Sequence, residues 1–227
     1  MQDSAPTLIN TSRASLPGRI TLSGSYVTVA PLSAAEHGDA LWAGSGGAHR
    51  EHLWRYLSEG PFLSRASFDA LLRQRETSAD PFFYAFIDPV SGQALGMAAF
   101  MRIEPAHRVI EIGSILYTDA LQKTRAATQA MYLLAQYAFE SLNYRRYEWK
   151  CNALNESSRN AALRLGFTFE GIFRQHMIIK GSNRDTAWFS VLDSEWPNRK
   201  ALLESWLDPS NFDPRGRQRK PLRALER

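Results

Sequence analysis

The spacing of hydrophobic residues along the first third of the chain indicates one strand followed by helices. Residues 25–33, SYVTVAPLS, alternate between apolar and polar positions, as in a strand that buries one face. Apolar residues then recur with helical spacing over residues 33–44, 49–58 and about 66–77. The first and third of these segments carry a serine near their start, where a hydroxyl can cap the helix.

A period of two dominates the middle of the chain. Residues 81–88, 93–104 and 109–118 are predicted to be three strands, and the DPVSG sequence between the first two suits a hairpin turn. The remaining elements follow as a helix at 123–141, a strand at 145–151, a helix at 156–165, strands within 167–180 and 184–192, and a helix at 194–207. This order predicts an α/β (α+β) fold in which a mixed sheet carries helices on both faces.

The two ends of the chain differ in composition from this patterned region. Residues 1–18 are polar and lack a sustained period, so we expect a flexible N-terminal arm before a domain at 19–207. Residues 214–227 hold six Lys or Arg and one Glu, whereas the whole chain has a net charge of +4. Residues 1–213 are therefore near neutral, and we expect 208–227 to form a basic, solvated tail. Nucleic-acid binding through this tail is the less favoured alternative.

Composition narrows the class of protein. The chain has 227 residues, of which 44% are hydrophobic, which is enough for one sizeable core. It has neither the roughly eighteen continuous apolar residues of a membrane span nor a signal-peptide pattern, so we expect a soluble, cytoplasmic protein. The single cysteine, Cys151, cannot form an internal disulfide and is expected to be a small core residue. The five histidines show no metal-binding spacing, so no metal site is predicted.

Asn155 and Ser158 lie in the connection between the strand at 145–151 and the next helix. One interpretation makes them helix caps, at Ncap and N3, a role worth about 1 kcal/mol. The other makes them ligand contacts. The residues by themselves leave both interpretations open.

Several short motifs in the second half of the chain occur in an order that resembles one family. They are Asn155-x-x-Ser158, Leu165-Gly166-Phe167, Glu170-Gly171, Arg174, Asp185 and Leu192-x-x-x-Trp196. Over about residues 20–196 the chain resembles the GNAT superfamily of acyl-CoA-dependent N-acetyltransferases, in its RimJ/RimL-like branch. The resemblance implies the GNAT fold, with a mixed, mostly antiparallel central sheet.

The resemblance also implies a pyrophosphate-binding loop, which reads Gln/Arg-x-x-Gly-x-Gly/Ala in the family. A helix N-terminus suits an anion because its first N–H groups lack partners and its dipole is positive. Arg125 replaces the first glycine of the pattern, so it either blocks the close approach of a phosphate or pairs with phosphate oxygens together with Lys123. The matching residues are Gln122, Lys123, Thr124, Arg125, Ala126 and Ala127.

Acyl transfer to an amine requires a base, a stabilised oxyanion and a proton for the leaving thiolate. By resemblance, Glu111 is the leading general base, directly or through water, with an exposed strand residue as the alternative. Backbone N–H groups near Ile115 and Leu116, splayed by a bulge, would hold the thioester carbonyl. The resemblance further implies that Asn155 contacts the pantetheine arm and that Ser158 protonates the thiolate.

The function implied by the resemblance is direct transfer of an acyl group from acetyl-CoA, or another acyl-CoA, to a primary amine. The acceptor amine belongs to a protein N-terminus or to a small molecule, and the branch often forms homodimers. A catalytically silent CoA-binding or sensor module is the alternative. Membrane association is not expected.

Overall fold

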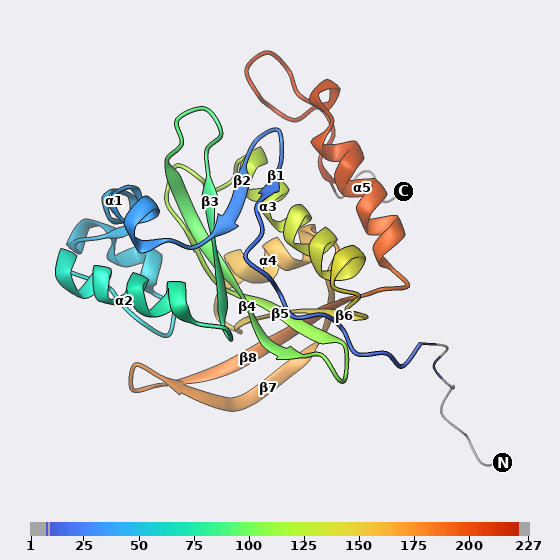
Figure 1. The fold of residues 1–227 in the computed structure, drawn as a ribbon, viewed down its shortest axis with the longest axis horizontal. Helices are drawn as coiled ribbons and strands as arrows, with labels where there is room; N and C mark the ends of the chain where they lie inside the picture. Colours follow the sequence, from blue (N-terminus) through green and yellow to red (C-terminus); the bar gives the residue numbers. More distant parts are fainter. Residues whose placement is uncertain (1–7, 9, 223–227) are drawn as a thin grey trace.

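The structure is a computed structural model that describes residue 8 and residues 10–222. Its elements follow the predicted order closely (Figure 1). They are β1 (Leu22–Ser23), β2 (Thr28–Pro31), α1 (Ala34–Ser45), η1 (Ala48–Trp54), α2 (Arg65–Thr77), β3 (Phe82–Ile87), β4 (Ala94–Glu104), β5 (Val109–Tyr117), α3 (Arg125–Gln136), η2 (Tyr137–Ser141), β6 (Arg146–Asn152), α4 (Glu156–Arg164), β7 (Thr168–Ile179), β8 (Ser182–Leu192), α5 (Trp196–Leu207) and η3 (Pro209–Asn211).

One eight-stranded sheet forms the centre of the molecule, in the order β1-β2-β3-β4-β5-β6-β8-β7. Neighbouring strands are antiparallel except β5 and β6, which are parallel and are joined by the α3 crossover. The prediction of a mixed, mostly antiparallel sheet is therefore confirmed.

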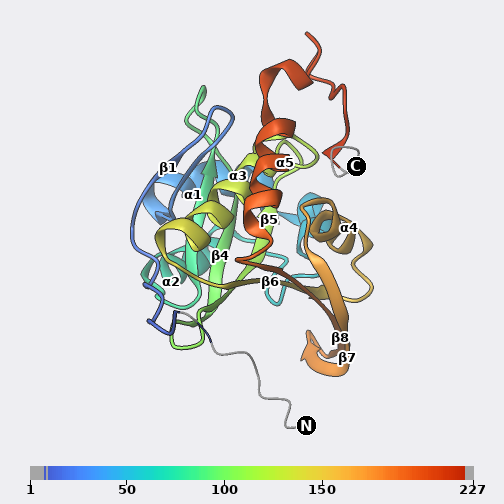
Figure 2. The same ribbon diagram turned by 90° about the vertical axis from the view of Figure 1, so that its right-hand side faces the viewer.

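Two hydrophobic cores lie on opposite faces of the sheet, and Figures 1 and 2 show the helices divided between them. Alternate residues of a strand point to opposite faces. On β3, Phe83 packs in the core with α1 and α2, whereas Tyr84 and Phe86 pack in the core with α3 and α5. The prediction of helices on both faces is confirmed.

The strands β5 and β6 pair over only part of their length. Their register runs from Val109↔Arg146 to Ile112↔Trp149, and beyond that point the two strands are not paired. On its other edge β5 contains a bulge, because Ser114 and Ile115 together stand opposite Ala98 of β4. Ser114 has a φ of 49°, in the left-handed region. The predicted bulge is thus present, one residue before the expected position.

The helix expected at 49–58 is replaced by η1, a short 3-10 helix at Ala48–Trp54. Trp54 is its only buried residue, and the indole Nε1–H donates to the Ser45 carbonyl at 2.7 Å. Without an apolar stripe to pack against the sheet, this segment gains little from forming a longer α-helix. The helix expected at 123–141 begins at Arg125, and its last turn, η2, is a π-helix.

The C-terminal segment, residues 208–222, is packed against the domain. Phe212 and Leu222 are 8% and 5% exposed, and the Phe212 ring meets Trp206 of α5 edge-on at 5.1 Å. The expectation of a solvated tail is therefore wrong for these residues. Its basic side chains are indeed exposed, but the few apolar residues between them are enough to anchor the backbone. Residues 223–227 lie outside the described part of the chain.

The N-terminal arm is described only in part. The backbone N–H of Ala14 donates to the Pro105 carbonyl at 3.0 Å, and that of Ser15 donates to the Leu142 carbonyl at 2.9 Å. This stretch therefore runs along the domain, while residues 1–7 and 9 lie outside the described residues. Within residues 8 and 10–222, no helix combines the length and apolar character needed to cross a membrane.

Candidate functional site

A cleft of about 1360 Å³ opens where β5 and β6 separate. Small-molecule sites usually occupy roughly 300–1,000 Å³, so this cleft is larger than most of them. Its walls come from η1, β5, the loop before α3, β6, α4, β7 and the C-terminal segment. It brings together most of the predicted site residues, namely Glu111, Ile115, Gln122, Lys123, Thr124, Arg125, Ala127, Asn155 and Ser158.

Leu116 and Ala126 are the two predicted residues whose side chains do not line the cleft. Leu116 is 1% exposed and packs in the core beneath α1 and α2. Ala126 packs against the core on the opposite face. Their predicted contributions concern backbone N–H groups, and these stay predictions.

The start of α3 provides an anion site at one end of the cleft. Thr124 is the Ncap, and its hydroxyl accepts a hydrogen bond from the Ala127 N–H at 3.1 Å. The N–H groups of Arg125 and Ala126 have no acceptor within the helix, because the first turn has no preceding carbonyls. Lys123 adopts a φ of 60°, so the backbone turns sharply two residues before Arg125.

Arg125, which replaces the glycine of the family pattern, is held between two aromatic rings. Its guanidinium carbon lies 4.5 Å from the ring centroids of both Tyr26 and Phe212. The residue is helical, so its backbone does not require glycine. The side chain thereby connects the predicted phosphate loop to the C-terminal segment.

Positive charge predominates in the cleft. Among the described residues, Glu111 is its single acidic side chain. Such a concave, cationic surface attracts polyanionic ligands. The basic residues that line it are Arg102, Lys123, Arg125, Lys150, Arg164, Arg184 and Arg217.

Glu111 lies on β5 and is only 3% exposed. Its Oε2 atom is 2.7 Å from Arg102 Nη1 and 2.9 Å from Lys150 Nζ. Burial raises the pKa of Glu111, and the charges of Lys150 and Arg102 oppose this rise. A carboxylate in this setting is more basic than an ordinary glutamate. The alternative interpretation of Glu111 as an exposed strand residue is wrong.

Lys150 holds Glu111 from the neighbouring strand. Its ammonium is also 2.6 Å from Glu148 Oε2 and lies 3.8 Å from the centroid of the Trp188 ring. These contacts fix the Lys150 charge beside Glu111. Gly113, two residues beyond Glu111, lets the Glu111 and Met101 side chains pack against the backbone, because a Cβ atom there would lie 3.1 Å from Glu111 Oε1 and 2.5 Å from Met101 Sδ.

The helix-cap interpretation of Asn155 and Ser158 is confirmed, whereas their contact with a ligand stays a prediction. Asn155 is the Ncap of α4, and its Oδ1 accepts a hydrogen bond from the Ser158 N–H at 3.1 Å. The Ser158 hydroxyl accepts a hydrogen bond from the Trp149 indole at 2.9 Å. Both side chains also line the cleft. Asn155 is therefore a helix cap, and the Ser158 oxygen is held in a defined position beside the cleft.

Cys151 is buried beside Ser158, as expected of a small core residue. Burial raises the pKa of the Cys151 thiol, and a hydrogen bond with Ser158 opposes the rise. A raised pKa disfavours the reactive thiolate. Within the described residues, no group of His, Cys, Asp and Glu side chains is arranged to hold a metal ion.

Sequence reasoning missed Arg102, Lys150 and the whole contribution of the C-terminal segment. A signal for Lys150 was present, because charged residues occupy alternate positions 146, 148 and 150 of a strand that is otherwise apolar. This pattern places the charges on one face of the strand. Arg102 carries no comparable signal.

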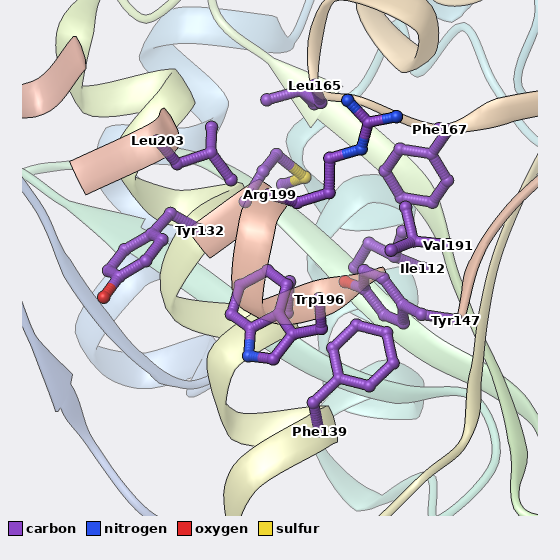
Figure 3. Close-up of a pocket in the computed structure, with 12 residues that line it drawn as sticks. Ile112, Tyr132, Phe139, Tyr147, Leu165, Phe167, Val191, Trp196, Arg199 and Leu203 are labelled. Atoms are coloured by element: carbon purple, nitrogen blue, oxygen red, sulfur yellow. The ribbon is translucent and has the colours of Figure 1, made fainter. Parts of the chain in front are cut away.

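A second cavity lies between α3, α5 and the sheet, but its chemistry does not suggest a site. Figure 3 shows it enclosed mainly by aromatic and aliphatic side chains, including Phe139, Tyr147 and Trp196. Its volume is about 20 Å³, which is room for roughly one water molecule. We therefore regard it as a packing defect beneath α5.

Comparison with protein families and solved structures adds independent evidence. A family described as Acetyltransferase (GNAT) domain matches residues 27–168. A GCN5-related N-acetyltransferase from Brucella melitensis is 50% identical, with a TM-score of 0.93 over 96% of this chain and 99% of its own. A probable acetyltransferase of the GNAT family from Chromobacterium violaceum ATCC 12472 is 38% identical, with a TM-score of 0.80 over 87% of this chain and 98% of its own.

Curated relatives match over a shorter stretch. The ribosomal-protein-serine acetyltransferase of Escherichia coli (strain K12) is 31% identical over 104 residues, which are 45% of this chain and 58% of that protein. A relative from Bacillus subtilis (strain 168) is 30% identical over 109 residues, 59% of its length. The chain thus spans less than two thirds of either curated relative.

Proposed function

This chain belongs to the GNAT acetyltransferase family, and from that premise we propose that it transfers the acetyl group of acetyl-CoA directly to a primary amine. The observation that carries the proposal is the cleft at the β5–β6 separation, which combines an anion site with a buried carboxylate. Acetyl-CoA would supply an activated thioester there. The chain's own residues would bind it, orient the amine and move protons.

The loop before α3 is the proposed site for the pyrophosphate. Its chemistry fits because the N–H groups at the start of α3 and the Lys123 ammonium offer hydrogen bonds and positive charge. The Thr124 cap fixes the first turn of α3 and with it the direction of these N–H groups. Gln122, Ala126 and Ala127 are proposed to surround the pyrophosphate in the same turn, where Ala126 offers its N–H; the Ala127 N–H is bonded to Thr124 and the Gln122 N–H to the Thr118 carbonyl.

Backbone N–H groups at the β5 bulge, near Ile115 and Leu116, are the proposed donors to the thioester carbonyl. A bulge turns peptide groups away from the regular ladder, and this one lies in the part of β5 beyond Ile112, where β6 no longer pairs. Donors fixed in advance stabilise an oxyanion without reorganising during the reaction.

Glu111 is the proposed general base. Its raised pKa suits it to accept a proton from an ammonium group, directly or through water. Lys150 and Arg102 act as positioning residues, because they hold the carboxylate at the wall of the cleft. Ser158 is the proposed proton donor to the departing thiolate, and Asn155 is the proposed contact of the pantetheine arm.

The acceptor is proposed to be a protein N-terminus or a small-molecule amine. The name of the Escherichia coli relative, a ribosomal-protein-serine acetyltransferase, supports the first of these. A catalytically silent CoA-binding module remains the second candidate, favoured by the arginine at the first glycine of the phosphate loop. Release of free CoA thiol in the presence of a pool of amines separates an enzyme from a silent module.

Neutralising Lys123 should weaken CoA binding. Isothermal titration calorimetry should show one CoA site per chain, with the Lys123→Gln variant binding about three- to tenfold more weakly at low salt. Lys200→Gln is a matched control, because Lys200 pairs with Glu140 and does not line the cleft. If the wild-type protein does not bind CoA, the donor assignment is wrong. Equal binding by the Lys123 variant would instead move the pyrophosphate away from this loop.

Replacing Ser158 with alanine separates its two roles. The Asn155 cap uses the backbone N–H of Ser158, so the cap survives, while the Trp149 indole loses an acceptor and Cys151 loses its hydrogen bond with Ser158. We expect a stability loss of about 1 kcal/mol and a turnover about tenfold lower, with donor affinity nearly unchanged. Denaturation, steady-state kinetics and calorimetry measure the three quantities. Turnover equal to that of the wild-type protein would leave Ser158 a structural residue.

A further inference from the structure

The C-terminal segment, residues 208–222, lies outside residues 27–168, which match the family domain, yet it forms part of the cleft wall. Four of its residues line the cleft: Phe212, Gly216, Arg217 and Gln218. Figures 1 and 2 show this segment leaving the end of α5 and turning back. It therefore adds a wall to the ligand site that the family domain does not supply.

Hydrogen bonds within the segment hold it in a defined conformation. Asp213 organises its turn, because Oδ1 accepts the N–H groups of Arg215 and Arg217, both at 2.9 Å, and Oδ2 accepts Arg217 Nε–H at 2.8 Å. Asn211 is buried and donates from Nδ2 to the carbonyls of Trp206 and Lys220, at 3.0 and 3.2 Å. Groups that are fixed before binding lose little entropy when a ligand arrives.

This turn is attached directly to the predicted phosphate loop. The Arg125 guanidinium is stacked on Phe212, and the Cβ position of Gly216 is 4.0 Å from Arg125 Nη2. Gln218 is fixed from the other side, because its Oε1 accepts the Trp206 indole N–H at 2.9 Å. Any ligand held at the start of α3 therefore lies next to residues 212–218.

The order of groups along the cleft identifies the part of the ligand that reaches this wall. Glu111 lies midway along β5, and the phosphate loop follows the end of that strand. With the acyl group near Glu111 and the pyrophosphate at residues 122–127, the adenosine end extends beyond the loop, toward the C-terminal segment. In CoA this end carries a 3′-phosphate, which is dianionic near neutral pH.

The chemistry of the segment suits that group. Of its four basic residues, Arg215, Arg217, Arg219 and Lys220, only Arg217 lines the cleft. The Arg217 side chain is 72% exposed, and its Nε–H is held by Asp213, so the end of the guanidinium is presented to solvent in a fixed orientation. Guanidinium groups recognise phosphates through paired, charge-assisted hydrogen bonds.

We propose that the C-terminal segment binds the 3′-phosphoadenosine end of CoA, with Arg217 as the residue that contacts the 3′-phosphate. This inference rests on the proposed function, because it presupposes that CoA occupies the cleft. It assigns a substrate-binding role to a segment that follows the residues matched by the family domain. It also explains why an arginine occupies the first glycine position of the family pattern. Arg125 connects the pyrophosphate loop to the segment that binds the adenosine end of CoA.

Calorimetry with CoA and with 3′-dephospho-CoA tests the proposal, because the two ligands differ only in the 3′-phosphate. At low salt, Arg217→Gln should bind CoA about five- to tenfold more weakly than the wild-type protein. Its affinity for 3′-dephospho-CoA should stay within about twofold of the wild-type value, because the lost contact is absent from that ligand. Arg217→Lys should recover part of the affinity for CoA.

Arg215→Gln is the matched control, since Arg215 is exposed on the same turn but does not line the cleft. Its affinity for both ligands should equal that of the wild-type protein. The role of the segment would be overturned if Arg217→Gln lowered the affinity for both ligands by the same factor, or if it lowered neither affinity. In both cases CoA binding by the wild-type protein would still stand. Failure of the wild-type protein to bind either ligand would overturn the proposed function together with this inference.

Discussion

Replacing Glu111 with glutamine should lower turnover by about a hundredfold or more while the protein stays folded. Glutamine keeps the size of the side chain but cannot accept a proton from the amine. Lys150 retains its contact with Glu148 at 2.6 Å, so the buried ammonium keeps one anionic partner in the variant. Steady-state kinetics measures turnover, and calorimetry with CoA should give an unchanged donor affinity.

The pH dependence provides a second readout for the same group. The base must be ionised, so kcat/KM should fall as the pH is lowered through the pKa of Glu111. Burial raises that pKa, which places the fall above the pH range of an ordinary glutamate. The residual activity of Glu111→Gln should lack this limb of the profile.

Glu148→Gln is the control for damage to the charge network. It removes one partner of Lys150, but Glu148 does not line the cleft. We expect reduced stability and a turnover within a few-fold of the wild-type value. A Glu111 variant that is no slower than the Glu148 variant would eliminate Glu111 as the base.

Replacing Phe212 with alanine should lower the free energy of unfolding by about 3 kcal/mol. The ring is 8% exposed, packs edge-on against Trp206 and carries the Arg125 guanidinium on its face. Its removal leaves a cavity at the point where the C-terminal segment joins the domain. Denaturant unfolding measures the loss.

Phe173→Ala on β7 is the control for this stability prediction, because the Phe173 side chain is 51% exposed. It should cost about 1 kcal/mol or less, since less apolar surface returns to water. If Phe212→Ala costs no more than this control, the C-terminal segment does not pack stably in solution. The expectation of a solvated tail would then be restored.

Local sequence patterns determined most of the fold. The change from helical spacing to a period of two located β3, β4 and β5, and the motif between 152 and 167 located the turn from β6 into α4. These signals are local, because a strand or a helix with one buried face repeats its apolar residues at its own period. The same stretches contain most of the predicted site residues. Thr124 and Asn155 are helix caps and Glu111 is a strand residue, so each position depends on a single element.

Only the tertiary structure decided how these residues act together. The register of β5 with β6 places Glu111 opposite Glu148 and within reach of Lys150, and α3 separates these strands in the sequence. No local period encodes a pairing between distant strands. The C-terminal segment was misjudged for a related reason. Its composition is dominated by exposed charge, whereas its position is fixed by Phe212. The partners of Phe212 are Trp206 and Arg125, and Arg125, which also stacks on Tyr26, reaches Phe212 only when the chain has folded.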